Sequence, residues 1–347
     1  MKGISTIIAT IIFVIITIGL VSTAYLFIGG IITGMTSKVI SIIDVKANRI
    51  IIRNDGTDTI PSGDIKIFVN GEQADILNPQ DIEPQHIAVL KFFPPELEMK
   101  SATISVMGAS NVLSYTSDIM PHEFKVTPNT IGLWHFDSVN ATNHTLDETS
   151  YHNDGQLMND TFSCFNEPWC IQLVPGKFGS ALYFNRSHDH VEIPDSNVFD
   201  FGTSDGFTIA MWARTDIHDT SNNIYYLFRR YPGAAIRIST RYGYFQLNDY
   251  NSLRDSGGTY TRFGGGGYLQ VGVWYHVAVV RDVAADQVLF YINGDLKDSK
   301  TDNTCPTCNY ISDDPITIGS SWNGTIDEVV IFDRALSQVE ILDSIYG

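Results

Sequence analysis

The sequence predicts a mainly β chain with a long apolar α-helix at its N-terminus, followed by a small antiparallel β-sandwich and a larger two-sheet jelly roll. Three observations predict this fold class. Residues 4–32 form a run of 29 without a charged side chain. Residues 38–120 alternate short β-branched segments with turn signals, and residues 131–347 repeat that pattern with almost no helical periodicity.

The charge balance argues against one class of partner. The chain has 39 Asp and Glu against 22 Lys and Arg, which gives a net charge of −17. Binding nucleic acid requires clustered Lys and Arg to neutralise phosphates, so we expect no nucleic-acid partner. The acidic composition is typical of a soluble exterior with sites for cations.

The apolar run is too long for a secretory signal, whose hydrophobic region is about 7–15 residues. It has the length of a bilayer span, and a helix over residues 4–37 would satisfy its own backbone in lipid. Lys2 lies on the short side, which places the bulk of the chain outside the cell. The pattern therefore predicts that the precursor is inserted in the membrane.

Residues 1–10, MKGISTIIAT, resemble the class III signal of archaeal type IV pilins and archaellins. The resemblance implies that a prepilin peptidase cuts between Gly3 and Ile4, so residues 1–3 are a leader peptide. It also implies that the helix then packs with like or related pilin subunits in a filament core. The alternative is a plain N-terminal anchor that never assembles.

Residues 38–120 read as about six strands with a turn at Asn70-Gly71, which predicts a small antiparallel sandwich. This segment resembles the β-domain that follows the helix in archaeal pilins. Pro121 and Pro128 predict a linker over residues 121–130.

Residues 131–347 form the third predicted domain. Asn293-Gly294 is a two-residue hairpin signal, and many strands with almost no helix predict a jelly roll. The exception is the end of the chain, where Ser337 and Glu340 form a capping box that starts a short helix.

This domain resembles the laminin-G-like, concanavalin A-like jelly rolls. The segments that carry the resemblance stand in the family's order: GLWHFD at 132–137, GKFGSAL at 176–182, FTIAMW at 207–212 and IDEVVIFDRALS at 326–337. Such domains mostly bind glycans, surface proteins or matrix, so the resemblance implies adhesion or recognition.

We predict no catalytic residues. Some relatives of the fold are glycoside hydrolases, which need two carboxylates on one strand face. Their Glu-x-Asp-x-Glu string is absent, and Glu192 and Asp195 would face opposite sides of a strand. A glycan-processing enzyme is therefore the weakest of the function classes considered.

Calcium is the cofactor that the resemblance implies. Relatives often hold one Ca²⁺ at the rim of the sandwich, and the corresponding ligands would be Asp137, Asp154 and Asp327, with carbonyl oxygens completing the shell. The alternative is structural: Asp154-Gly155 is an ordinary turn pair, and Asp327 would pair with Arg334.

Four cysteines occur in two close pairs, Cys164 with Cys170 and Cys305 with Cys308. Outside the cell, two short-loop disulfides are the natural interpretation. A zinc site with four thiolates is the alternative, and three disulfide connectivities are formally open.

Two further sets of residues fit an extracellular surface protein. Aromatic side chains that could stack on sugar rings are Tyr225, Tyr226, Tyr244 and Trp322, although core packing is the competing role. Asn-x-Ser/Thr glycosylation sequons begin at Asn140, Asn143, Asn159, Asn185 and Asn323.

Together these observations predict a pilin-like subunit of an archaeal type IV pilus or related filament, which displays a laminin-G-like domain for glycan or surface recognition. The alternative is a monomeric membrane-anchored adhesin with the same outer domain. Either would lie at the cell surface.

Overall fold

The computed structural model describes most of the chain after the apolar run. The described residues are 37–46, 49–93, 99–106, 112–119, 121–167, 169–185, 188–217, 223–231, 235–241, 252–254, 260–264, 269–302 and 309–346. They divide into two compact units, residues up to Met120 and residues Pro121–Gly347. Each unit is described separately below.

The first unit is a single antiparallel sheet of seven strands in the order β1-β2-β5-β4-β3-β6-β7. The end strands β1 and β7 contact each other, so the sheet wraps around its own core. Its strands are β1 (Ile40–Lys46), β2 (Arg49–Asn54), β3 (Ile65–Val69), β4 (Glu72–Ile76), β5 (Ile87–Phe93), β6 (Met99–Val106) and β7 (Val112–Ile119), with a 3₁₀ turn η1 (Ser62–Asp64) before β3.

Local sequence explains this sheet well. Asn70 and Gly71 both have positive φ, at 51° and 90°, as the two-residue turn between β3 and β4 requires. Ile50 and Ile52 on β2 are fully buried and alternate with more exposed neighbours, which gives the sheet an apolar face.

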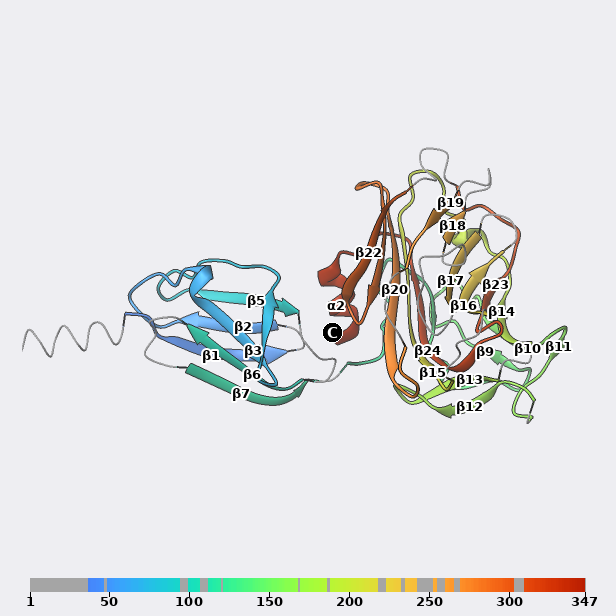
Figure 1. Cartoon of the computed structure of the whole chain (residues 1–347), viewed down its shortest axis with the longest axis horizontal. Helices are drawn as coiled ribbons and strands as arrows, with labels where there is room; N and C mark the ends of the chain where they lie inside the picture. The colour runs from blue at the N-terminus through green and yellow to red at the C-terminus, as the bar shows by residue number, and fades with distance from the viewer. Residues whose placement is uncertain are drawn as a thin grey trace, which may run out of the picture. The chain divides into compact units, whose positions relative to one another are not determined.

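The second unit is a two-sheet sandwich (Figure 1). One sheet has nine strands in the order β11-β10-β14-β23-β16-β17-β18-β19, and β9 pairs with β10. Its strands are β9 (His144–Thr145), β10 (Gly155–Asn159), β11 (Phe162–Ser163), β14 (Asp189–Ile193), β16 (Ile224–Arg230), β17 (Ala235–Arg241), β18 (Ser252–Arg254), β19 (Tyr260–Arg262) and β23 (Ile316–Ile318).

The other sheet has eight strands in the order β12-β13-β24-β15-β20-β21-β22, and β8 pairs with β24. Its strands are β8 (Thr130–Trp134), β12 (Gln172–Pro175), β13 (Ser180–Asn185), β15 (Phe207–Thr215), β20 (Trp274–Asp282), β21 (Gln287–Ile292), β22 (Asp295–Thr301) and β24 (Asn323–Phe332), and η2 (Asn197–Phe199) precedes β15. Every pairing in both sheets is antiparallel.

The main core lies between these two sheets. Large apolar side chains from both sheets meet there, among them Trp134, Phe184, Met211, Phe228 and Phe290. Burying this apolar surface is the main stabilising contribution to the unit.

A second packed layer lies on the outer face of the eight-stranded sheet. The ring of Phe124 contacts the ring of His276 on β20, with centroids 5.7 Å apart. The helix α2 (Gln338–Tyr346) buries Leu342 against Gly294 in the β21–β22 turn. Residues 121–130, for which the sequence predicts a linker, therefore belong to the second unit.

The predicted fold class is wrong in one respect: a long apolar N-terminal helix is not part of the structure described. In the described residues the α-helix is α2, which is short and C-terminal, and the chain is mainly β. The predicted helix at 4–37 falls on residues outside the described ones except for Ser37, which lies in a bend. The prediction rested on hydropathy and on the resemblance to pilins, and Ile, Val and Thr are poor helix formers in water.

No helix among the described residues is long and apolar enough to cross a membrane. The predicted processing site at Gly3 and Ile4 also lies outside the described residues.

Candidate functional site

Two of the three predicted calcium ligands meet at one loop. Asp137 accepts a hydrogen bond at Oδ1 from the backbone N–H of Ser180, at 2.7 Å. Asp327 accepts two at Oδ2 from the N–H groups of Lys177 and Phe178, at 2.8 and 3.0 Å. The loop 176–180 therefore connects both carboxyl groups.

Asp327 is buried in a way that strongly disfavours its charge. Burial, together with the nearby carboxylates of Glu328 and Asp137, raises its pKa to about 8 despite the two hydrogen bonds from backbone N–H groups. Its Oδ1 is buried and has no hydrogen-bond partner. An unpartnered acceptor of this kind is what a bound cation or a proton would satisfy.

Asp154 does not join them. Its Oδ1 accepts the N–H of Asp147 at 3.0 Å, which fixes the turn before β10. Among the described residues no group of three or more His, Cys, Asp or Glu side chains is arranged to hold a metal. The residues therefore fit the predicted three-aspartate calcium site only in part, through Asp137 and Asp327. The predicted alternative, an ion pair of Asp327 with Arg334, does not form, since Arg334 pairs with Glu340 at 2.8 Å.

One predicted disulfide is confirmed. Cys164 and Cys170 are bonded, with a Cα–Cα distance of 5.5 Å. Cys305 and Cys308 lie outside the described residues.

The predicted glycosylation acceptors differ in accessibility. Asn140 is exposed, and its side-chain oxygen accepts hydrogen bonds from Thr142 and His144. Asn143, Asn159, Asn185 and Asn323 are half-buried. The amide nitrogen of Asn159, the atom that a glycan would modify, donates to the Trp169 carbonyl and to Asp189.

The predicted ligand-facing aromatics separate into two groups. Tyr225 and Trp322 are core residues, 6% and 2% exposed. Tyr226 is half-buried beside Arg229, and Tyr244 lies outside the described residues. Strand alternation explains the contrast between Tyr225 and Tyr226, because successive side chains on β16 point to opposite faces of the sheet.

Tyr226 belongs to a cluster that we call the Arg–Tyr face, formed by Tyr226, Arg229, Tyr231 and Arg237. Arg229 and Arg237 are direct partners across the β16–β17 pair. Ile236 and Ile238 lie in the core, so Arg237 between them points to the outer side of the nine-stranded sheet. Tyr231 follows the end of β16 and is 37% exposed.

Rings and guanidinium groups stack within this face. The Cζ of Arg229 lies 5.0 Å from the Tyr226 ring centroid and 4.5 Å from that of Tyr231. The Cζ of Arg237 lies 4.1 Å from the Tyr231 centroid. Tyr231 is thus shared by both arginines in cation–π contacts.

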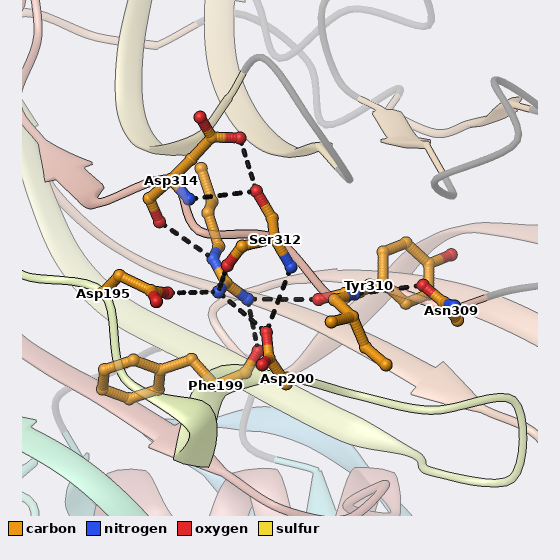
Figure 2. A network of polar contacts seen from close by, with 9 residues as sticks. Asp195, Phe199, Asp200, Asn309, Tyr310, Ser312 and Asp314 are labelled. Carbon is orange, nitrogen blue, oxygen red and sulfur yellow. Dashed lines mark hydrogen bonds and ion pairs between the residues drawn. The ribbon is translucent and has the colours of Figure 1, made fainter.

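The end of β16 is fixed by the neighbouring Arg230, whose side chain is 1% exposed. Its guanidinium donates to Asp195 at 2.8 Å and to Asp200 at 2.9 Å. Figure 2 shows the polar network in which these aspartates meet the segment from Tyr310 to Asp314.

Arg230 also donates to a set of backbone carbonyls, those of Phe199, Tyr310, Ser312 and Asp314. A buried charge with this many partners is fully satisfied. It holds the segments 195–200 and 310–314 in place. It also anchors β16 between Arg229 and Tyr231, so the Arg–Tyr face has a rigid support.

Arg229, Tyr231 and Arg237 were not predicted from the sequence. The available signal was the string RRYPG at 229–233, in which two arginines and a tyrosine precede a Pro-Gly turn signal between two strands. A hairpin there would bring Arg237 beside Arg229, but choosing the pairing requires the register.

A pocket lies elsewhere, on the side of α2. It has a volume of about 380 Å³ and is lined by the segment 122–129, the end of β24 and the polar side of α2. Its principal charged groups are already paired, since Arg334 contacts Glu340 at 2.8 Å and Asn129 at 3.2 Å.

Comparison with known families agrees with this fold. The family model Laminin_G_3, described as the concanavalin A-like lectin/glucanases superfamily, matches residues 185–342. The match lies within the second unit, whose two-sheet sandwich is a concanavalin A-like jelly roll. No curated protein matches the chain.

Solved structures similar to the chain include two binding domains and one domain of an arabinanase. The binding domain of Paraclostridial Mosquitocidal Protein 1 is 18% identical over 62% of this chain and 51% of its own, with a TM-score of 0.49. Domain 4 of AbnA, a GH43 extracellular arabinanase from Geobacillus stearothermophilus solved with arabinotriose, is 22% identical over 65% of this chain and 100% of its own, with a TM-score of 0.46.

The third is the botulinum neurotoxin serotype D binding domain, 17% identical over 62% of this chain and 50% of its own, with a TM-score of 0.47. The chain thus spans about half the length of the first and third of these structures. At these identities and scores none of them carries an argument about function.

Proposed function

We propose that the second unit binds carbohydrate without catalysis, through the outer side of its nine-stranded sheet. The observation that carries the proposal is the Arg–Tyr face, where tyrosine rings and guanidinium groups stand together on a lectin-type jelly roll. Aromatic rings and convergent polar donors are the groups that protein sites use to orient a sugar.

The two sheets differ in a way that supports this choice. The eight-stranded sheet carries Phe124 and α2 on its outer side. Across the nine-stranded sheet the described residues place no helix, and its outward residues include Tyr226, Arg229 and Arg237. A ligand can approach the second sheet without displacing a packed layer.

The proposal includes an extracellular location, at the cell surface, with a glycan or glycosylated surface protein as partner. The Cys164–Cys170 disulfide supports it, because such bonds persist in oxidising compartments. The filament role predicted from residues 1–37 has no support among the described residues and stays a sequence-based prediction. Mass spectrometry of the mature N-terminus would test it.

The test is a glycan array with the full chain, followed by titration of the best ligand. We expect binding without release of reducing sugar. Tyr226→Ala and Tyr231→Ala should each weaken binding about tenfold, or about 1.4 kcal/mol, because each ring orients a guanidinium group of the face. Tyr151→Ala is the matched control, since Tyr151 is 53% exposed and lies outside the face.

Three results would contradict the proposal. Absence of binding to every glycan tested would remove the function itself. Equal affinities for all three tyrosine variants and the parent would show that the ligand binds somewhere else. Reducing sugar that accumulates with time would identify an enzyme.

A further inference from the structure

We infer that the ligand of the Arg–Tyr face is an anionic saccharide, a sugar chain that carries carboxylate or sulfate groups. The inference rests on the proposed function, which is carbohydrate binding, and adds that the carbohydrate is negatively charged. Its basis is that Arg229 and Arg237 contact tyrosine rings, whereas five other arginines of the second and first units contact carboxylates.

Five of the arginines described pair with a carboxylate. Arg53 pairs with Asp55, Arg214 with Asp216, Arg230 with Asp195 and Asp200, Arg281 with Asp302, and Arg334 with Glu340. In a chain with 39 acidic residues, such pairing is easily satisfied.

Arg229 and Arg237 contact tyrosine rings, and no carboxylate of the described residues pairs with either of them. The Nε of Arg237 is buried and has no hydrogen-bond partner. A cation–π contact uses the face of a guanidinium and leaves its N–H edges free to donate. The fork of donors that an Arg offers to carboxylate or sulfate is therefore available here.

The strand register makes this arrangement costly without a ligand. Arg229 lies directly opposite Arg237, and like charges in that position destabilise a sheet. Continuing across the sheet, Arg237 pairs with Ser252 and Ser252 with Arg262. Arg262 is exposed, and it lies between the buried Thr261 and Phe263, so it points to the same outer side.

The row therefore brings guanidinium groups from β16, β17 and β19 to one side of the sheet. In the other direction Arg229 pairs with Thr317, and Thr317 with Glu192. Strands are spaced about 4.8 Å apart, so Glu192 is two strands, roughly 10 Å, from Arg229. The carboxylate closest in this row is too far to pair with Arg229.

The guanidinium groups that lie over the Tyr231 ring favour an acidic ligand over a neutral one. Both arginines lie over Tyr231, so guanidinium groups already occupy the positions where a neutral sugar would stack on this ring. What this part of the face offers is charged N–H donors. Their preferred acceptors are oxyanions, and Arg230 fixes the strand that presents them.

The experiment compares charged polymers with their neutralised forms, using the full chain. The probes are polygalacturonate with its carboxyl-reduced derivative, and heparin with desulfated, N-acetylated heparin. We expect at least tenfold tighter binding of one charged polymer than of its neutral counterpart, and affinity that falls with added salt. The two pairs distinguish a carboxylate from a sulfate.

Variants locate the site. Arg229→Gln and Arg237→Gln should each weaken binding of the charged polymer about tenfold or more. Arg237→Lys keeps the charge but loses the planar fork, so it should restore only part of the affinity. Arg214→Gln is the matched control, because Arg214 also stacks on a ring, that of Trp274 at 5.3 Å, but on the other sheet.

The outcomes separate the inference from the proposed function. One outcome is that charged and neutral polymers bind equally, and that this binding is lost in the tyrosine variants but unchanged in the arginine variants. That outcome overturns the inference and leaves the proposed function intact. Binding of polyglutamate as tight as that of the saccharides overturns it too, since charge alone would then suffice. Absence of binding to every saccharide overturns both.

Discussion

His276 is fully buried on β20, and neither ring nitrogen has a hydrogen-bond partner. Its ring packs between Trp212 at 5.5 Å and Phe124 at 5.7 Å. Burial lowers its pKa from 6.5 to about 3. The folded protein therefore keeps this imidazole neutral over a pH range in which the unfolded chain protonates it.

This difference predicts acid sensitivity. The folded state binds fewer protons than the unfolded state between pH 6.5 and about 3, so stability is highest above 6.5 and falls as the pH drops. His276 should contribute up to about 1.4 kcal/mol per pH unit in that window. His276→Phe should flatten the pH dependence of the free energy of unfolding, measured with urea between pH 4.5 and 7.

The control for that measurement is His152→Gln, because His152 is exposed. If the free energy of unfolding depends on pH equally in the parent, the His276 variant and the His152 variant, burial of His276 is not a source of the acid sensitivity.

Asp327 leads to a prediction about calcium. Ca²⁺ would have to bind the ionised carboxylate, whose pKa burial raises to about 8, so any stabilisation should grow as the pH rises toward 8. We expect calcium to raise the melting temperature, by the equivalent of about 2–4 kcal/mol at a hundred to a thousand times the dissociation constant.

Asp327→Asn should abolish that response, whereas Asp154→Asn should retain it, because Asp154 belongs to a separate turn. A response lost in the Asp154 variant would restore the three-aspartate site. If calcium at pH 8 does not change the melting temperature of the parent protein, there is no calcium site at Asp327.

At the scale of elements, the predicted capping box and hairpin turn are both confirmed. Ser337 Oγ accepts the N–H of Glu340 at 3.3 Å, and Glu340 accepts the N–H of Ser337 at 2.9 Å. Asn293 and Gly294 have φ of 53° and 78°, as a two-residue turn between β21 and β22 requires. Local sequence is sufficient for such features because their hydrogen bonds lie within a few residues.

Gly294 also has a tertiary role that predicts a substitution effect. A Cβ there would overlap Leu342 of α2, whereas a Cβ at Gly272, which has the same φ of 78°, would meet nothing within 4 Å. Both glycine-to-alanine changes share the strain of positive φ, but Gly294→Ala should destabilise the unit by about 1–3 kcal/mol more. Urea unfolding of both variants measures the difference, and equal losses would show that α2 adjusts freely.

At the scale of the whole molecule, the boundary between units falls at Met120. Phe124 is 3% exposed, its N–H donates to Glu328 at 2.7 Å, and the N–H of His122 donates to the Ile345 carbonyl at 2.9 Å. The segment therefore completes the layer on the eight-stranded sheet.

This packing predicts where the second unit can be cut. A fragment of residues 121–347 should fold alone, and a fragment of residues 130–347 should be less stable by about 3 kcal/mol or more, the cost of removing a buried Phe. Thermal unfolding followed by circular dichroism would compare them. Equal melting temperatures would mean that residues 121–129 add nothing to the unit.

The sequence by itself determined the β architecture after residue 37, the two Asn-Gly turns, the capped final helix and the lectin-type jelly roll. Alternation, turn residues and caps act over short distances along the chain, so their patterns can be recognised without the fold. Hydropathy alone was insufficient for residues 4–37, because it measures length and apolarity and not conformation.

Only the tertiary structure decided which residues meet. Asp137 and Asp327 approach each other because loop 176–180 joins them, while the similar Asp154 stays in its own turn. The Arg–Tyr face likewise depends on the register that sets Arg229 opposite Arg237, and a shift by one residue would turn both into the core. Such contacts join residues far apart in the chain, and no local pattern specifies them.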